Sequence, residues 1–596
     1  MSVQKVSWGR IFWPSFWAAL IVSILGLLIW LIMILSLSSI GNAKGLSVAD
    51  KSILHMTLNG QIGEKAKSNF DPGSMQMNYT LGLADILHGL EVAKTEDNIK
   101  GVYIEIDALQ CGFATAKEIR DAINDFETSG KFAVAYNSGE IISHLEYYIA
   151  SAANENYGFP SSNMQFLGLG AELSFFKNTL DNLEIEMQVI RGSDNDFKSA
   201  VEPFFRSNMS DSSRVQIETY LAGLWSDYRK DIALERKVSS ELLDSIAENA
   251  LIQDVTDAVG FKLIDATKYR DEVIQLLSDK VQLEEDAELE LLSFSKYSKK
   301  RFNQDQTLAK EDEPNIAVIL AEGGVSKSGD GLSSDDICKL FIEARNNETV
   351  KTVVFRINSP GGSALASDEI WREVKLTNEV KPVIVSMGDV AASGGYYIAA
   401  PATAIFAEPT TITGSIGVFG VIPYTGKMME NKLGLTFDRA STNKHSIMTT
   451  NRKLTDGEMT LIQQGVDDIY DLFKTRVAEG RKMTKEQVNV IGRGRVWTGR
   501  DAKRIGLVDE LGGLKDAITY AAKKAGIKEV KPLYYPLIKT DQLADLLEQL
   551  GDENQTAVSI SSTQLPNAVI KYYKQLKSLE DIQGIQMRLP YEFVIE

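Results

Sequence analysis

Two short stretches of sequence decide the fold: IKGVYIEID at Ile99–Asp107 and VKTVVFRIN at Val350–Asn358. Each is a nearly continuous run of β-branched and aromatic residues that ends in a polar residue. Such a run is typical of a strand buried on both faces of a parallel sheet. Because the same pattern recurs at an offset of about 250 residues, it indicates an internal repeat.

The repeat extends well beyond these two strands. A Glu-Ile pair follows each strand, at Glu118 and at Glu369, and a second apolar stretch follows each pair. The tetrapeptide YYIA then occurs at Tyr147–Ala150 and again at Tyr396–Ala399. An ordered series of matches indicates a tandem duplication. Since apolar strands alternate with helical segments, we expect an α/β fold with mostly parallel strands in each copy.

The repeat also predicts where the domains begin and end. Charge-rich stretches such as LEEDAELE and KYSKKR separate the two copies and predict a linker or a solvated helix. The tail after Pro532 has little pattern. We therefore expect a short stub with a membrane anchor, a first copy, a charged linker, a second copy and a C-terminal extension, at residues 1–50, 51–277, 278–314, 315–531 and 532–596.

The composition excludes several classes of function. The net charge of −18 over 596 residues disfavours nucleic-acid binding, because neutralising phosphates requires clustered cations. Two cysteines cannot build a disulfide framework or a four-cysteine zinc site. The four histidines form no HExxH motif. We expect neither a metal ion nor a cofactor.

An apolar run near the N-terminus predicts a membrane anchor. Residues 16–37 read FWAALIVSILGLLIWLIMILSL without a charge. At 1.5 Å per residue, such a helix spans roughly 33 Å, enough for a bilayer core. Lys5 and Arg10 precede it, so the positive-inside rule keeps the short end in the cytoplasm and the rest across the membrane. A cleaved signal peptide is the alternative, although its apolar region is usually about 7–15 residues.

Three glycine-rich turns follow one another in the second copy: NSPGGS at 358–363, DVAASGGY at 389–396 and TGSIGVFG at 413–420. The backbone N–H groups of Gly361 and Gly362 lie in a tight turn that suits an oxyanion hole. Ser393 directly precedes Gly394. A helix that begins at Gly394 would place its free N–H groups and its dipole beside Ser393, and both favour negative charge that develops there. Ser393 is therefore a candidate nucleophile, and an N-cap serine is the alternative interpretation.

A serine nucleophile requires a base, and no histidine–aspartate pair stands out. A lysine serves when burial keeps its amine neutral. Lys198, in the first copy, and Lys444, in the second, fall at roughly equivalent positions of the repeat, and composition does not choose between them. Asp194 and Asp196 beside Lys198 would oppose this role unless their carboxylates point to water.

The second copy resembles the signal peptide peptidase A family of membrane-anchored serine proteases. The resemblance rests on four motifs in this order: NSPGGS, GDVAASGGYYIA, TGSIGVFG and GRVWTGRDAKRIGLVDELGG. The stretch FKSAVEPFFR at 197–206, within a degenerate first copy, is similar to the long tandem-repeat bacterial form. The resemblance implies two tandem crotonase-like or Clp-protease-like domains. It also implies Ser393 as nucleophile, Lys198 as general base and Gly361, Gly362 and Gly394 as oxyanion donors.

The resemblance further implies what the protein acts on and where it resides. The expected substrates are cleaved signal peptides and other hydrophobic peptides, and the expected assembly is a homotetramer. The expected location is the bacterial inner membrane, with residues 16–37 in lipid and the catalytic region on the periplasmic side. The alternatives are an acyl-CoA enzyme of the crotonase superfamily and a catalytically idle membrane scaffold.

Overall fold

The computed structural model describes residues 48–71, 76–283, 289–311, 313–329, 331–537 and 585–588, and parts of 13–28. The chain forms two units. One comprises residues 1–49, 68–79 and 539–559 and includes most of the two-stranded sheet of β2 (Lys67–Asp71) and β3 (Gln76–Thr80). The other, called the main unit below, comprises residues 50–67, 80–538 and 560–596 and contains both predicted copies.

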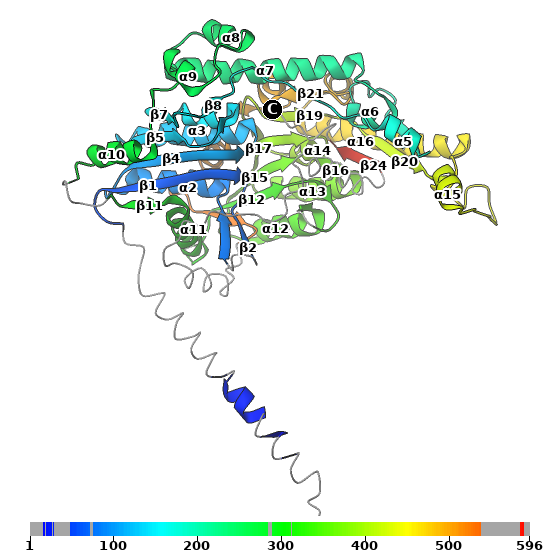
Figure 1. Cartoon of the computed structure of the whole chain (residues 1–596). Helices are drawn as coiled ribbons and strands as arrows, with labels where there is room; N and C mark the ends of the chain where they lie inside the picture. Colours follow the sequence, from blue (N-terminus) through cyan, green and yellow to red (C-terminus); the bar gives the residue numbers. More distant parts are fainter. Residues whose placement is uncertain are drawn as a thin grey trace, which may run out of the picture. The chain divides into compact units, whose positions relative to one another are not determined.

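The first copy is built on a six-stranded parallel sheet (Figure 1). Its order is β10-β7-β5-β4-β1-β11, and the predicted strand at 99–107 lies within β4 near its centre. The strands are β1 (Ser52–Gln61), β4 (Ile99–Gln110), β5 (Phe132–Asn137), β7 (Glu155–Gly158), β10 (Ala266–Thr267) and β11 (Leu291–Ser293).

The second copy repeats this order of strands. Its central sheet runs β22-β18-β17-β15-β12-β23, with β19 and β21 continuing from the far end of β17. The strands are β12 (Ile316–Glu322), β15 (Thr352–Ser359), β17 (Val383–Ala392), β18 (Ala404–Ala407), β19 (Ile412–Gly414), β21 (Val496–Thr498), β22 (Glu510–Leu511) and β23 (Pro532–Tyr535). The predicted α/β fold and the duplication are thus confirmed.

Helices cover both faces of the second sheet because its strands are apolar on both sides. Along β12, Ala317 and Ile319 belong to a core shared with α12, α13, α14 and α16, whereas Ile316 and Val318 belong to a core shared with α19. This alternation follows from the two-residue period of a strand. The helices are α12 (Ser334–Asn346), α13 (Ala364–Asn378), α14 (Gly394–Ala399), α16 (Asp456–Arg481), α17 (Lys485–Ile491), α18 (Gly499–Arg504) and α19 (Leu514–Ala525).

The helices of the first copy follow the same plan. Its longest helix, α7 (Asp211–Arg236), matches α16 in length, and both end at a lysine in the left-handed conformation, Lys237 and Lys482. The others are α2 (Leu83–Thr95), α3 (Phe113–Glu127), α4 (His144–Ala150), α5 (Lys177–Asn182), α6 (Glu202–Phe205), α8 (Ser240–Glu248), α9 (Val255–Gly260) and α10 (Arg270–Lys280), with the short strands β6 (Ile141–Ile142) and β8 (Asn163–Met164).

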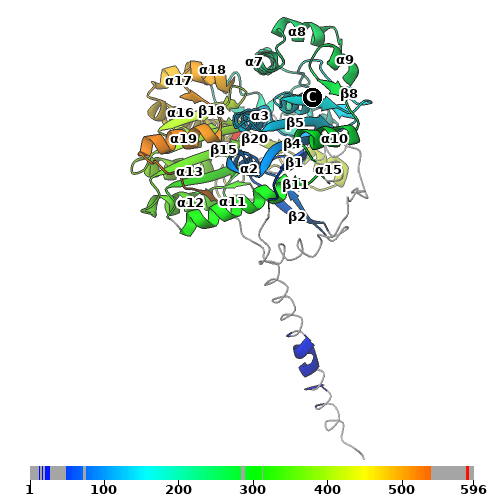
Figure 2. The same ribbon diagram turned by 90° about the vertical axis from the view of Figure 1, so that its left-hand side faces the viewer.

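The segment between the copies, predicted as a linker or a solvated helix, contains a helix that is partly buried. Strand β11 forms the edge of the first sheet, and α11 (Phe294–Glu311) buries Phe294, Tyr297 and Phe302. Figure 2 shows α11 running beside α2. The charges of KYSKKR lie within α11, and aromatic residues at helical spacing place one face of this helix in the core.

A third sheet joins the two copies. Its order is β14-β13-β16-β24-β20-β9, and only β9 (Glu186–Arg191) comes from the first copy. The second copy supplies β13 (Val325–Ser326), β14 (Leu332–Ser333), β16 (Gly361–Ser363) and β20 (Phe419–Tyr424), and the C-terminal extension supplies β24 (Ile585–Arg588). The antiparallel pairing of β9 with β20 brings a first-copy segment against the second copy.

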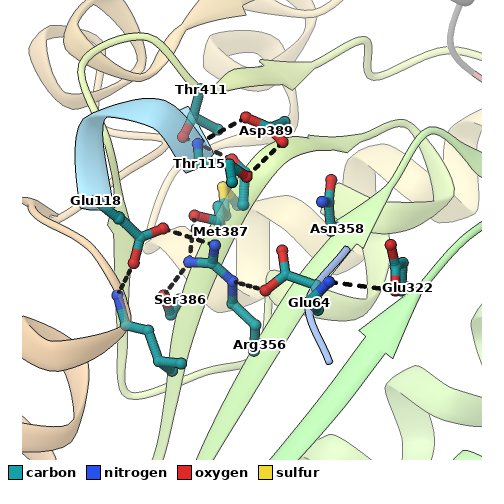
Figure 3. Close-up of polar contacts among 12 residues, drawn as sticks. Glu64, Thr115, Glu118, Glu322, Arg356, Asn358, Ser386, Met387, Asp389 and Thr411 are labelled. Carbon is teal, nitrogen blue, oxygen red and sulfur yellow. Dashed lines mark hydrogen bonds and ion pairs between the residues drawn. The ribbon is translucent and has the colours of Figure 1, made fainter. Parts of the chain in front are cut away.

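A buried ionic network also ties the copies together (Figure 3). The guanidinium of Arg356, on β15, donates to Glu64 at 2.8 Å and to Glu118 at 2.6 Å, both from the first copy. Next to it, the N–H and hydroxyl of Thr115 donate to the carboxylate of Asp389 at 2.8 and 2.6 Å. Arg356 and both glutamates are almost completely buried, so the network fixes one copy against the other.

The predicted membrane anchor is not visible as a spanning helix. Among the residues that the structure describes, no helix combines the length and the apolar character needed to cross a bilayer. Residues 29–37 of the predicted span, with several before them, lie outside the described part of the chain.

Candidate active site

Ser393 lies at the sharp turn between β17 and α14. Its backbone angles are φ 53° and ψ −114°, a conformation that a non-glycine residue rarely adopts. Its N–H donates to the carbonyl of Gly414 at 2.8 Å. Ser393 occupies the N-cap position of α14, as the alternative interpretation predicts, but its side chain makes no capping hydrogen bond to the helix. Strain of this kind is concentrated at functional sites.

Lys198 reaches this turn from the first copy. It follows β9 and directly precedes the short 3-10 helix η1 (Ser199–Val201), which leads into α6 (Glu202–Phe205). The N–H of Phe197 donates to the carbonyl of Arg493 at 3.0 Å, which fixes this segment against the second copy. A methyl group on Gly494 would lie 2.6 Å from Lys198 Cβ, so a glycine there permits the close approach.

The amine of Lys198 and the hydroxyl of Ser393 meet in the interior. Lys198 Nζ lies 2.9 Å from Ser393 Oγ, and neither residue is exposed to solvent. Burial lowers the pKa of Lys198 well below that of an ordinary lysine. The neighbouring acids do not oppose this shift, because Asp196 pairs with Arg493 and Asp194 lies within hydrogen-bond reach of Asn489.

Ser415 is a third member of the site, and the sequence analysis did not single it out. Lys198 Nζ donates to Ser415 Oγ at 2.9 Å and to the carbonyl of Ser415 at 3.1 Å. Ser415 is itself buried and has a positive φ of 50°. The sequence could have pointed to Ser415, because it lies inside the third glycine-rich turn, which was already a candidate part of the site.

The three predicted oxyanion glycines lie together beside Ser393. A methyl group on Gly394 would lie 3.1 Å from the backbone nitrogen of Gly362, and one on Gly361 would lie 2.6 Å from the backbone nitrogen of Gly394. Gly361 has a φ of 91°, which favours glycine. Backbone N–H groups from two turns are therefore close enough to serve one oxygen atom.

The other candidate base lies elsewhere. Lys444 is exposed, within a stretch of exposed residues at 432–446. At the first-copy position that matches Ser393, His144 begins α4 and lies among Phe166, Trp225 and Tyr228. Burial lowers the pKa of His144 to about 4, as expected for a core histidine. Within the described residues, no group of three or more potential metal ligands is present.

These features define a class: an α/β protein of two fused copies with a strained serine, a buried amine and convergent backbone donors. The sequence pattern of peptidase family S49 matches residues 126–284 and 375–528, which include Lys198 and Ser393 respectively. The chain belongs to peptidase family S49 and is a serine-type peptidase.

Individual relatives agree with this assignment. The chain is 34% identical to the chloroplastic serine protease SPPA of Arabidopsis thaliana over 555 residues, covering 90% of this chain and 77% of that protein. It is 33% identical to Protease 4 of Salmonella typhi, covering 83% and 82% respectively. A protein of Enterococcus faecium named for signal peptide peptidase SppA is 34% identical over 226 residues, 37% of this chain and 65% of its own length.

Proposed function

We propose that Ser393 and Lys198 form a catalytic dyad that hydrolyses peptide bonds. The observation that carries the proposal is the 2.9 Å separation of Lys198 Nζ and Ser393 Oγ in a site closed to solvent. A neutral lysine amine can take the proton of the serine hydroxyl, and burial favours that neutral form. Ser415 would hold the amine in the orientation that the transfer needs.

The proposed reaction is acyl transfer in two stages. Ser393 Oγ attacks the peptide carbonyl while Lys198 takes its proton. The backbone N–H groups of Gly362 and Gly394, with the turn at Gly361, stabilise the oxyanion, and removing one such donor typically slows catalysis about 10²–10³-fold. Lys198 then protonates the leaving amine, and water releases the acyl group from Ser393.

The experiment compares three lysine and serine variants on an apolar signal-peptide substrate. Ser393→Ala and Lys198→Met should each lower kcat at least about a thousandfold, as removal of a triad member does. Lys339→Met, on α12 with its side chain 73% exposed, is the matched control and should stay within about twofold of wild type. Wild-type rates in both Ser393→Ala and Lys198→Met would refute the dyad.

We propose cleaved signal peptides and other hydrophobic peptides as the substrates. The name of the Enterococcus faecium relative supports this class. The third sheet supports an extended substrate, because β24 already lies there as an extended strand between β16 and β20, in a position that another extended peptide could take. A crotonase-like acyl-CoA enzyme would have no use for a serine–lysine pair.

We propose that residues 16–37 anchor the protein in the bacterial inner membrane, with the main unit on the periplasmic side. The uncharged run and the preceding cations support this arrangement. Membranes washed with carbonate should retain the full chain, and external protease on spheroplasts should digest the main unit. Release of the chain by carbonate would refute the anchor.

We propose that copies of this chain assemble, as a homotetramer, through the segment at 434–446. In the first copy the equivalent segment contains β9, which pairs with β20. In the second copy it follows α15 (Gly426–Leu433) and carries exposed apolar side chains, with Leu435 50% and Phe437 39% exposed. Exposed apolar residues of this kind mark interfaces.

Phe437→Asp should convert the tetramer to smaller species, measured by light scattering after size exclusion. Val490→Asp, on the exposed face of α17, is the matched control and should leave the mass unchanged. An unchanged mass in Phe437→Asp would refute this interface.

A further inference from the structure

Gln216 is a buried amide on α7 that no step of the proposed reaction uses. It is 2% exposed and lies on the buried face of this helix, together with Ser213, Ile217 and Tyr220. An amide in the interior needs hydrogen-bond partners, because leaving it unpaired costs free energy. The two partners of Gln216 come from two different parts of the active site.

At one end, the amide reaches the segment that carries the lysine. Gln216 Nε2 donates to Ser199 Oγ at 3.2 Å, and Ser199 is fully buried. Ser199 directly follows Lys198 and begins the 3-10 helix η1. The hydrogen bond between Gln216 and Ser199 therefore holds the backbone from which the Lys198 side chain extends.

At its other end, the amide reaches the strand that supports the serine. The N–H of Val496 donates to Gln216 Oε1 at 2.9 Å. Val496 lies opposite Gly414 in the pairing of β21 with β19. The carbonyl of Gly414 in turn accepts the N–H of Ser393 at 2.8 Å. Strand β21 thus supports the turn that carries the proposed nucleophile.

The same strand segment also holds Ser415. The N–H of Ser415 donates at 2.7 Å to the carbonyl of Arg495, the residue before Val496. Because Ser415 contacts the Lys198 amine, a shift of β21 relative to η1 would change the distances from the amine to its hydroxyl partners. A single side chain that is bonded to both η1 and β21 limits such a shift.

Comparison of the two copies shows that this amide is not a feature of the repeated fold. Helices α7 and α16 have 26 residues each, and Gln216 and Leu461 lie five residues after the start of their helices. Leu461 is 48% exposed. Helix α7, by contrast, runs beside β21 (Figure 1), where a methyl group on Gly223 would lie 3.0 Å from Thr498 Cγ2. The amide therefore occurs in the copy that supplies the lysine.

On the basis of the proposed function, we infer that Gln216 is a positioning residue of the reaction. Its amide holds η1 and β21 in one register, so that the Lys198 amine meets Ser393 and Ser415 at hydrogen-bond distance. Gln216 acts through its bonded neighbours and takes no proton itself. Since proton transfer depends on the orientation of the amine, the effect belongs to kcat rather than to substrate binding.

The test compares Gln216→Met with Gln275→Met on an external apolar peptide. Methionine keeps the length of the side chain and removes both hydrogen bonds. We expect kcat to fall about 10–100-fold and KM to stay within about twofold. The midpoint of the pH profile should move, because the surroundings of the Lys198 amine change. Gln275, exposed on α10, is the matched control and should behave like wild type.

A double variant separates positioning from a general loss of stability. Gln216→Met and Ser415→Ala both act on the same amine, so their combined loss in kcat should be smaller than the product of the two single losses. Ser199→Ala removes only one of the two hydrogen bonds and should lower kcat about threefold. This smaller change keeps the inference testable if Gln216→Met does not fold.

The outcomes distinguish this inference from the proposed function. If Ser393→Ala and Lys198→Met are inactive while Gln216→Met and Ser199→Ala keep the kcat and the pH midpoint of wild type, the inference fails and the proposed function stands. Fully multiplicative losses in the double variant would also overturn the inference. If Ser393→Ala and Lys198→Met retain wild-type rates, the proposed function fails and the inference fails with it.

Discussion

At the scale of single residues, the proposed site depends on one amine whose burial favours the uncharged form. Lys198 is fully buried, and within the described residues its amine contacts the hydroxyls of Ser393 and Ser415 and the Ser415 carbonyl. None of these groups carries a charge that would favour the ammonium form. Burial thus acts without opposition and lowers the pKa of Lys198.

This chemistry predicts the pH dependence of the activity. The base works as the neutral amine, so kcat/KM should rise as the pH increases through the lowered pKa of Lys198. The rise should be complete well below the ordinary lysine value of about 10.4. Steady-state rates on an external peptide between mildly acidic and alkaline pH measure the profile. A flat profile over that range would contradict a lysine base.

Ser415→Ala should show whether Ser415 orients the Lys198 amine. The variant removes one hydrogen-bond partner from Lys198 Nζ but leaves the amine and Ser393 in place. We expect kcat to fall about tenfold with KM within about twofold, and the midpoint of the pH profile to move, because the surroundings of the amine change. Ser161→Ala, in an exposed turn of the first copy, is the control. An unchanged pH profile would argue against this role.

At the scale of elements, the oxyanion site depends on how closely two turns approach. The turn before α13 carries Gly361 and Gly362, and the turn before α14 carries Gly394. Side chains at these positions would occupy the space where the substrate carbonyl and its backbone donors must meet. These two glycine turns on neighbouring strands thus form the proposed pocket for an oxygen atom.

Gly361→Ala should abolish most of the activity. Its methyl group would lie 2.6 Å from the Gly394 nitrogen, and its φ of 91° is unfavourable for alanine. We expect kcat to fall about 10²–10³-fold, the usual cost of one lost oxyanion donor. Gly260→Ala, where nothing lies within 4 Å, is the control. Activity within a few fold of wild type in Gly361→Ala would contradict the assigned oxyanion site.

At the scale of the main unit, the site exists only because two copies pack in one register. Strand β9 pairs with β20, and the network around Arg356 locks β15 and β17 against the first copy. Asp389, four residues before Ser393, accepts hydrogen bonds from Thr115 at the start of α3. The copy that has no candidate nucleophile therefore positions both the lysine and the turn that carries the serine.

Arg356→Ala should strongly destabilise this packing. It would leave Glu64 and Glu118 buried without their cation, and breaking a buried pair in this way typically costs about 3–5 kcal/mol. Denaturant unfolding measures the loss. Arg504→Ala is the control, since its pair with Asp501 is exposed and should contribute at most about 0.5 kcal/mol. Equal stabilities of the two variants would contradict a structural role for the network.

Some features were predictable because they depend on residues that are close together in the sequence. The duplication, the apolar strands β4 and β15 and the three glycine turns follow from patterns a few residues long. Ser393 and the three glycines could be chosen for the same reason. The segment at 294–311 was predicted poorly, because its charges are conspicuous in the sequence while the burial of Phe294 depends on distant neighbours.

The amino-acid pattern alone predicts two α/β copies and the turns that could hold a nucleophile, but it leaves Lys198 and Lys444 as equal candidates for the base. The family resemblance favours Lys198, and the three-dimensional fold brings the Lys198 amine to Ser393. Lys198 and Ser393 are 195 residues apart in the chain, and Lys444 looked equivalent to Lys198 by repeat position. The difference arises because β9 crosses to the other copy, and β24 arrives from the far end of the chain. The pairing of β9 and β24 with distant strands depends on sheet register and on burial, and a short stretch of sequence does not determine either.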